Sequence, residues 1–373
     1  MNLDISRAVH YHEGKFPPKS LDYARIMPAL LAATDALARY DQMLKGMHNC
    51  EIFLAPLRSQ EAVISSRMEG TISTMDEILQ LEAEYGDNVG EASEFRFDVI
   101  ETALYQRALT TAHRQIEDGR PLSESLLKSI HQQLLSFGRG AGKSPGAYKT
   151  EQNYIGERGN REVSFVPVAP ELLASGMGSL FTVMGDEQMP ILLRAALCHV
   201  EFEALHPFKD GNGRVGRMLI TLMLWKGGAI SAPHFYISRH FEDHKDEYIA
   251  RMREVSASDA WDEWCIFFLT AAKEQAIQNL DVAETIRTCY EEMKSRFSDL
   301  LASKYSVAAL DYIFTYPVFR NSRFTKNAGI PPQTAARFTR VLLNEGMLET
   351  VQEASGRKSA MYRFEPLMKL VRV

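Results

Sequence analysis

Residues 206–217 read His-Pro-Phe-Lys-Asp-Gly-Asn-Gly-Arg-Val-Gly-Arg, and the rest of the chain is organised around this stretch. Apolar residues recur at helical spacing on both sides of it. They are Ile191, Ala195, Cys198 and Phe202 before the turn, and Val215, Met218, Leu219, Leu222 and Met223 after it. Pro207 ends the first helix, and Gly211 and Gly213 let the backbone turn and approach an anion. The stretch is therefore predicted to be the loop of a helix-loop-helix unit.

The side chains of this loop match the chemistry of a polyphosphate site. The second helix begins with unpaired N–H groups and the positive end of its dipole facing the loop. Asn212, Arg214 and Arg217 can donate hydrogen bonds to phosphate oxygens. Asp210 offers one carboxylate, which is how proteins commonly hold Mg²⁺ beside phosphate groups. His206 can take a proton from an incoming hydroxyl group near neutral pH.

The stretch matches all nine fixed positions of the signature HPFxDGNGRxxR, and the chain resembles Fic-domain proteins in this respect. The resemblance covers nearly the whole chain and is most specific at residues 206–217. It implies a mainly α fold, in which a Fic helical core carries a β-hairpin flap. Most members of the family transfer AMP from ATP to a hydroxyl group of a target protein.

The resemblance therefore implies a protein adenylyltransferase that uses ATP and Mg²⁺ and modifies a Tyr, Thr or Ser hydroxyl of target proteins or of itself. His206 would be the catalytic base, and Asp210 would bind the metal. The residues expected to bind ATP are Glu69, Ile155, Gly156, Asp210, Gly211, Asn212, Gly213, Arg214, Arg217 and Tyr248. Two alternatives stay open: removal of AMP by the same site, and a nucleotide-sensing transcriptional regulator that binds DNA.

A second motif lies upstream, at Ser65-Ser66-Arg67-Met68-Glu69-Gly70. Ser65 and Glu69 are four residues apart and share one face of a helix, and Gly70 can end that helix. The motif resembles the inhibitory sequence [ST]xxxE[GN] of Fic proteins, whose glutamate pairs with the second arginine of the signature. The implied partner here is Arg217, and the implied consequence is autoinhibition by Glu69.

Residues 138–170 are rich in Gly and polar residues and contain short β-like runs, which predict a β-hairpin. The runs are 146–150, 152–156 and 163–167. The hairpin resembles the flap of Fic proteins, which aligns the target segment beside the nucleotide by main-chain pairing. The tip of this flap, residues 157–161, is expected to be mobile.

The remaining pattern predicts four regions. Residues 1–90 are assigned to an N-terminal arm and inhibitory-helix region, and residues 91–272 to a Fic catalytic core. Residues 273–300 are assigned to a linking helix and residues 301–373 to a winged-helix domain. Residues 1–20 are expected to be an extended arm that packs on the body. Helices are expected over 21–44, 56–67, 94–118, 123–135 and 272–300. An apolar cluster before the linking helix is interpreted as core: Trp261, Trp264, Phe267, Phe268 and Leu269.

The C-terminal region resembles a winged helix-turn-helix domain. Three helices and a two-stranded wing are expected in the order 307–314, 324–330, 331–346, 348–351 and 360–364. Side chains on the second main helix and the wing fit contacts with DNA phosphates. They are Thr334, Arg337, Arg340, Arg357 and Lys358. A fold does not establish a function, and protein docking or homodimer formation is favoured here over DNA binding.

Composition agrees with an ordinary globular chain of two or three domains, since 45% of the 373 residues are hydrophobic and 24% are charged. Residues 300–373 hold 11 Lys and Arg against 5 Asp and Glu, a net charge of +6, which leaves −12 for the rest of a chain whose total is −6. The four cysteines are widely spaced and form no CxxC pair, which indicates a reducing cytoplasm. No run is long and apolar enough for a membrane span.

Overall fold

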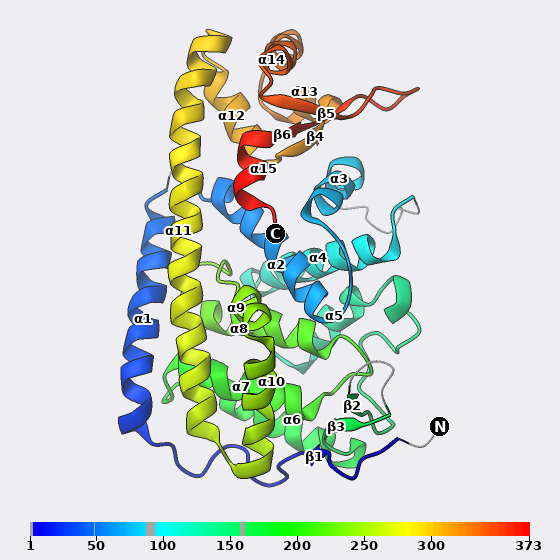
Figure 1. Ribbon diagram of the computed structural model, residues 1–373, viewed down its shortest axis with the longest axis vertical. Helices are drawn as coiled ribbons and strands as arrows, with labels where there is room; N and C mark the ends of the chain where they lie inside the picture. Colours follow the sequence, from blue (N-terminus) through cyan, green and yellow to red (C-terminus); the bar gives the residue numbers. More distant parts are fainter. Residues whose placement is uncertain (1–2, 48, 87–93, 157–160) are drawn as a thin grey trace. The chain divides into compact units, whose positions relative to one another are not determined.

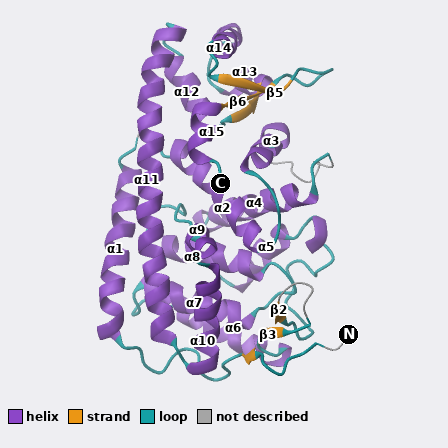
Figure 2. Cartoon of the chain, in the orientation of Figure 1, coloured by secondary structure: helices purple, strands orange, loops and turns teal. Residues whose placement is uncertain are grey.

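The computed structural model describes residues 3–47, 49–86, 94–156 and 161–373. Helices account for most of these residues, and the described strands are few and short (Figure 2). This confirms the mainly α fold class. The chain divides into two compact units, of which the first comprises residues 1–42 and 107–277 and the second comprises residues 43–106 and 278–373.

The first unit is built around two helices, α7 (Ile191–Leu205) and α8 (Asn212–Lys226) (Figure 1). Nearly every residue of both helices is buried, which is the pattern of helices enclosed on all sides. The helices α6 (Pro170–Met184) and α10 (Lys245–Ser258) pack on α7, and α5 (Glu124–Leu134) packs on α8. The short helix α9 (Ser238–Asp243) precedes α10. This enclosure fixes the two helix ends between which residues 206–211 run.

Close contact between α7 and α8 depends on Gly216. A Cβ atom at this position would lie 2.4 Å from Glu203 Oε1 and 3.1 Å from the ring of Phe202. The carboxylate of Glu203 can rotate away, but the contact with the ring of Phe202 is tighter than usual, so a larger residue would require this buried ring to shift. Gly216 occupies a position that the signature leaves unspecified, and it was not among the predicted site residues.

The predicted flap is a short antiparallel hairpin. Strands β2 (Ile155–Gly156) and β3 (Val163–Val166) pair with Ile155 opposite Phe165, and the tip residues 157–160 lie outside the described residues. The earlier run 146–150 forms no strand. The N-terminal arm packs on the body as predicted, because β1 (Val9–His10) pairs in parallel with β3 and gives the sheet order β1-β3-β2.

Side chains of the arm also bond to the helical core. The hydroxyl of Tyr11 donates to Glu201 Oε1 at 2.8 Å, and His12 Nε2 lies 2.8 Å from Glu201 Oε2. The other ring nitrogen of His12 lies 2.7 Å from the hydroxyl of Ser256 on α10. His12 and Glu201 are both buried, so these bonds form in a region of low dielectric constant, where they hold the arm in place.

The long helices agree with the periodicity of the sequence, with differences at their ends. The helices α1 (Tyr23–Lys45) and α4 (Phe97–Glu117) lie close to the predicted spans. The helix α11 (Trp261–Leu301) is continuous, so the apolar cluster at its start and the charged stretch after residue 272 belong to one helix. All five residues of that cluster are buried, as predicted. The division into four regions stays a prediction.

The second unit begins with α2 (Glu51–Met68) and α3 (Met75–Tyr85), of which α3 was not predicted. Its C-terminal part contains the predicted elements in the predicted order, with a further strand, β4, after the first helix and a further helix, α15, at the end. The elements are α12 (Ser306–Thr315), β4 (Val318–Arg320), α13 (Asn321–Asn327), α14 (Pro332–Asn344), β5 (Leu348–Gln352), β6 (Met361–Phe364) and α15 (Glu365–Val371). The strands form an antiparallel sheet in the order β4-β6-β5. The assignment to the winged-helix class stays a prediction.

Ion pairs join α3 to this sheet. Arg363 Nη1 lies 3.0 Å from Asp76 Oδ1, and the guanidinium of Arg320 bonds to Glu84. Lys358, predicted as a wing residue for DNA phosphates, instead lies 2.8 Å from Glu84 Oε1. None of the helices in the described parts of the chain combines the length and apolar character needed to cross a membrane.

Candidate active site

His206 occupies the turn directly after α7. Its backbone has φ +46° and ψ +60°, a left-handed conformation that is uncommon outside glycine, and its N–H donates to Phe202 O at 3.0 Å. This conformation ends the helix and turns the chain toward the loop. The ring atom Nδ1 lies 3.4 Å from Glu203 O, which suits an Nδ1–H tautomer and leaves Nε2 to accept a proton.

Asn212 closes the loop between the two helices. Its Oδ1 accepts from Phe208 N and its Nδ2 donates to Phe208 O, both at 2.8 Å. The ring of Phe208 is fully buried and stacks on the ring of His131, with the two centroids 3.7 Å apart. Asn212 was predicted to donate to phosphate. The structure gives its amide a loop-closing contact, and the phosphate contact stays a prediction.

Two residues that were not predicted hold the carbonyl groups of the loop. Lys149 Nζ donates to Leu205 O at 3.0 Å and to Asn153 Oδ1 at 2.8 Å, while Lys149 N donates to Pro207 O. Asn153 Nδ2 in turn donates to His206 O and Phe208 O at 3.0 and 3.1 Å. Burial lowers the pKa of Lys149 to about 7. The segment before the flap therefore fixes the backbone on both sides of His206.

His131 of α5 supports the other side of the loop. Its Nδ1 accepts from Gly146 N at 2.8 Å, so its Nε2 carries the hydrogen and donates to Asp210 O at 3.0 Å. Burial, together with the charge of the nearby Arg214, lowers the pKa of His131 to about 4. His131 is therefore neutral at physiological pH and acts as a hydrogen-bond donor to the backbone of the predicted metal-binding residue.

The start of α8 provides an anion-binding geometry. Gly211 precedes the helix with φ +76°, and its N–H donates to Asp210 Oδ1 at 2.6 Å. Arg214 is only 3% exposed, and its Nε and Nη1 atoms are buried without a hydrogen-bond partner among the described residues. Its Nη2 lies 3.7 Å from Asp210 Oδ1. A buried guanidinium with unsatisfied donors costs free energy, and an anion at the helix N-terminus would satisfy them.

Asp210 fits the metal-binding role predicted for it. Its side chain is 42% exposed, although one oxygen already accepts from Gly211 N. The described residues contain no group of three or more His, Cys, Asp or Glu that could hold a metal ion by themselves. One carboxylate beside an anion site is the arrangement in which Mg²⁺ takes its remaining ligands from phosphate oxygens and water.

Tyr248 and Arg217 lie deeper in the core. The hydroxyl of Tyr248 donates to His199 Nε2 at 2.8 Å, while His199 Nδ1 lies 3.3 Å from Gly216 O. Burial, together with the charge of Arg217, lowers the pKa of His199 to about 3. Tyr248 is 4% exposed and stacks on Phe241. The structure thus gives Tyr248 a packing role, and its predicted contact with ATP stays a prediction.

The predicted inhibitory motif ends α2 in the second unit. Ser65 is fully buried, Glu69 is the residue that follows the helix, and Gly70 has φ +80°, as expected for the glycine that ends a helix. The residues of the predicted ATP site belong otherwise to the first unit. The pairing of Glu69 with Arg217 stays a prediction, as do ATP contacts by Ile155 and Gly156 of β2.

The fold and the loop together define a helical protein in which a glycine-containing polar turn joins two core helices. The model of the Fic/DOC family matches residues 121–224, and the model of the Fic/DOC family N-terminal region matches residues 27–114. The chain belongs to the Fic/DOC family. The resemblance inferred from the signature is thereby confirmed.

Relatives extend the comparison over different lengths. A probable protein adenylyltransferase of Aquifex aeolicus is 23% identical, over 81% of this chain and 85% of the relative. A protein adenylyltransferase of Caenorhabditis briggsae is 30% identical over 30% of this chain, which spans only 24% of that relative. The crystal structure of a Fic family protein from Desulfovibrio desulfuricans matches with a TM-score of 0.58 at 16% identity, covering 93% of this chain and 98% of that one. The last match supports the fold alone.

Proposed function

We propose that the protein is a protein adenylyltransferase that transfers AMP from ATP to a Tyr, Thr or Ser hydroxyl of a target protein. The observation that carries this proposal is the buried guanidinium of Arg214, whose donors lack partners at the N-terminus of α8. The names of the relatives support adenylyl transfer over other uses of an anion site. Modification of the protein itself is part of the proposal.

The reaction would be a displacement at the α-phosphorus of ATP. His206 Nε2 takes the proton of the target hydroxyl, and the hydroxyl oxygen forms a bond to that phosphorus. The bond between the phosphorus and the bridging oxygen breaks, and pyrophosphate leaves with the electron pair. Arg214 and the first N–H groups of α8 stabilise the charge on the phosphate oxygens. AMP remains attached to the target.

Asp210 would hold Mg²⁺, and a metal ion bound there would neutralise part of the charge on the phosphates. The loop fixes Asp210 for this task through two contacts. His131 donates to its carbonyl oxygen, and the N–H of Gly211 bonds to its carboxylate. These two bonds to the backbone restrict the rotation of the Asp210 side chain. The second carboxylate oxygen therefore has a fixed direction in which to meet the metal ion.

The flap would position the target. Strand β3 is flanked by β1 on one side and β2 on the other, so both of its edges are already paired. An extended target segment would therefore add to the outer edge of β2, next to Ile155 and Gly156. Such pairing requires an extended backbone and little sequence specificity.

Glu69 would inhibit transfer by pairing with Arg217. The motif supports this role, since Glu69 ends α2 and Gly70 turns the chain directly after it. A glutamate paired with Arg217 would occupy part of the place of the γ-phosphate and hold ATP away from the productive pose. Activity of the parent protein is accordingly expected to be low.

The test uses the Glu69→Gly variant with ATP labelled on either the α- or the γ-phosphate, in a lysate of the source cells. Label from the α-phosphate should appear on protein, and label from the γ-phosphate should not. Mass spectrometry of the labelled peptides identifies the modified hydroxyl. Transfer of γ-label would assign phosphate transfer instead, and the absence of any label from both nucleotides would reject the proposed activity.

A further inference from the structure

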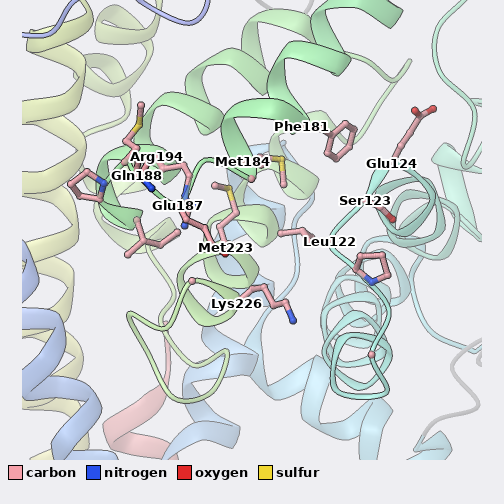
Figure 3. A pocket seen from close by; sticks show the side chains of 17 residues that line it. Leu122, Ser123, Glu124, Phe181, Met184, Glu187, Gln188, Arg194, Met223 and Lys226 are labelled. Carbon is pink, nitrogen blue, oxygen red and sulfur yellow. The ribbon is translucent and has the colours of Figure 1, made fainter.

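A second cavity lies at the ends of α7 and α8 that are farthest along these helices from the catalytic loop (Figure 3). The cavity is lined by the first turn of α7, the last turn of α8, the end of α6 and the start of α5. Its volume is about 860 Å³, within the range of sites for small molecules. The cavity lies within the first unit, and none of the residues proposed for adenylyl transfer lines it.

Arg194 is the buried cation of this cavity. It is 7% exposed, and its Nε atom is buried without a hydrogen-bond partner in the parts of the chain that the structure describes. This Nε–H group has been removed from water without gaining a bond among the described residues, which costs free energy. Arg214, proposed to bind an anion in the catalytic loop, has two such atoms, Nε and Nη1. Arg194 therefore points independently to a missing anionic partner.

Two helix N-termini strengthen the preference for an anion. Pro190 precedes α7 and Ser123 precedes α5, both residues line the cavity, and neither provides a side-chain cap. The first N–H groups of these helices and the positive ends of their dipoles favour negative charge. Lys226 adds a cation at the wall (Figure 3). Glu124 and Glu187 also line the cavity, but Glu124 is paired with Lys128 at 2.5 Å.

The rest of the wall contains a group of apolar side chains beside the polar residues Ser123 and Gln188. Phe181, Met184, Met223 and Leu122 contribute aromatic, thioether and aliphatic surface (Figure 3). Methionine side chains are flexible and adapt to ligands of different shape. A wall of this kind fits the hydrocarbon part of a ligand, whereas a free inorganic anion would leave it uncovered.

We propose that this cavity binds a small anion with an apolar body, a carboxylate or a phosphate ester. The anionic head lies against Arg194 and the start of α7, and the apolar body lies against Met184 and Met223. The proposal concerns binding, so it holds or fails independently of the proposed adenylyl transfer.

Calorimetry on the full chain tests the proposal with four probes: decanoate, phenyl phosphate, decanol and inorganic phosphate. Decanoate or phenyl phosphate should bind with one-to-one stoichiometry, and the stronger of the two identifies the head group. Decanol lacks the anionic head and inorganic phosphate lacks the apolar body. Both should therefore bind at least tenfold more weakly. Equal binding of decanol would show that Arg194 is not used, and no binding of either amphipathic anion would overturn the proposal.

Two matched variants locate the bound anion. Arg194→Met should weaken binding at least tenfold, whereas Arg214→Met, which removes a buried guanidinium from the catalytic loop, should leave it unchanged. The opposite result would place the anion in the loop and reject the cavity. Arg194→Met should also have a melting temperature equal to or above that of the parent, because it removes an unpartnered buried charge.

A lower melting temperature for Arg194→Met would show that the guanidinium supports the fold. In that case Lys226→Glu decides, because Lys226 is exposed and its replacement leaves the core intact. Reversing this charge should weaken decanoate binding at least threefold. Unchanged affinity in a correctly folded Lys226→Glu protein, together with a destabilised Arg194→Met protein, would reject the site.

Discussion

His206 is held at the end of α7 by its own backbone conformation and by the bond from Asn153 to its carbonyl oxygen. The backbone of the turn should therefore keep its conformation when the imidazole ring is removed by mutation. We expect His206→Ala to abolish transfer and to leave ATP binding nearly intact, because the histidine acts on the target hydroxyl and not on the triphosphate. An assay of self-modification and calorimetry with ATP separate the two effects. Transfer within a few-fold of the parent would refute His206 as the base.

Asp210 is the only acidic residue in the loop 206–217. We expect Asp210→Ala to remove both the activity and its dependence on Mg²⁺, since no second carboxylate in the loop can take the metal. The activity is measured in a series of Mg²⁺ concentrations and after treatment with a chelator. A variant with parental activity that still responds to millimolar Mg²⁺ would show that the metal binds elsewhere.

His131 should make the stability of the protein depend on pH. Its pKa is lowered to about 4 in the folded protein, mainly by burial, from an unfolded value of about 6.5. The unfolded chain therefore binds the proton first as the pH falls. The contribution of neutral His131 is fully present above about pH 6.5 and is lost progressively down to about pH 4, by about 1–3 kcal/mol in total.

Urea unfolding between pH 7 and pH 4 tests this expectation. His131→Gln should lose stability less steeply with falling pH than the parent does, because one site of proton uptake on unfolding is gone. His199, whose pKa is lowered in the same direction, contributes equally to both proteins. Identical slopes for His131→Gln and the parent would contradict the account.

At the scale of elements, helical periodicity predicted the helices around the signature well. The reason is that α7 and α8 repeat apolar residues over about four turns, which fixes both their type and their extent. The start of α2 was predicted at Pro56, but the helix begins five residues earlier at Glu51. A proline at a first turn is a common start signal, and tertiary packing here extends the helix before it.

Two of the helices that were not predicted, α3 and α6, have start signals in the sequence. The helix α3 begins with a capping box, in which Thr74 accepts from Glu77 N and the Glu77 side chain bonds to Thr74 N. The pattern Thr-x-x-Glu before Ile78 was a readable signal for this start. The helix α6 begins directly at Pro170, within the stretch that had been assigned to the flap. Its start at a proline was likewise visible in the sequence.

The supports of the catalytic loop could not be predicted. His131, Lys149 and Asn153 lie more than 50 residues before the groups that they bond, and no local pattern distinguishes them from other polar residues. Their roles arise from the packing of α5 and the segment before the flap on the loop. The signature itself was predictable because its residues are adjacent in sequence and act together.

A prediction about two elements follows from the inhibitory motif, because Glu69 at the end of α2 is proposed to pair with Arg217, the second arginine of the signature. Breaking one Glu–Arg pair before ATP can bind productively costs on the order of 1–3 kcal/mol. This cost corresponds to an activity about ten- to a hundredfold lower. Glu69→Gly should therefore raise adenylylation substantially. Arg217→Ala should not, because it removes the inhibitory partner and the γ-phosphate contact together.

The double variant Glu69→Gly, Arg217→Ala should behave like Arg217→Ala alone. Activities are compared at saturating ATP with a competent target, so that differences in nucleotide affinity do not enter. If Glu69→Gly is no faster than the parent under these conditions, Ser65–Gly70 is an ordinary helix end.

At the scale of the whole molecule, the charge distribution argues against DNA as the main partner. The net charge of +6 in residues 300–373 is outweighed by −12 in the rest of the chain. Lys358 is paired with Glu84 and Glu94, and Arg337 donates to Leu301 O at 2.7 Å. Fewer cations are then available to displace counterions from a duplex than the sequence had indicated.

We therefore expect no retardation of random or own-promoter DNA by the full chain at about 0.15 M salt. Electrophoretic mobility over a salt series checks this, with Arg340→Glu as the matched variant, because Arg340 is exposed on α14. A complex that weakens steeply with salt and is lost in Arg340→Glu would restore the alternative of a DNA-binding regulator.

The pairing of β1 with β3 has a consequence for the order in which the protein forms. Residues 9 and 10 find their partners at 165 and 166, and Tyr11 and His12 find theirs at Glu201 and Ser256. During synthesis the arm emerges before its partners, and more than 200 further residues must follow before all of these contacts can exist. Contacts so distant in sequence form slowly. The arm is therefore made well before it becomes fixed, and until then both edges of the β2–β3 hairpin are open to pairing with other chains.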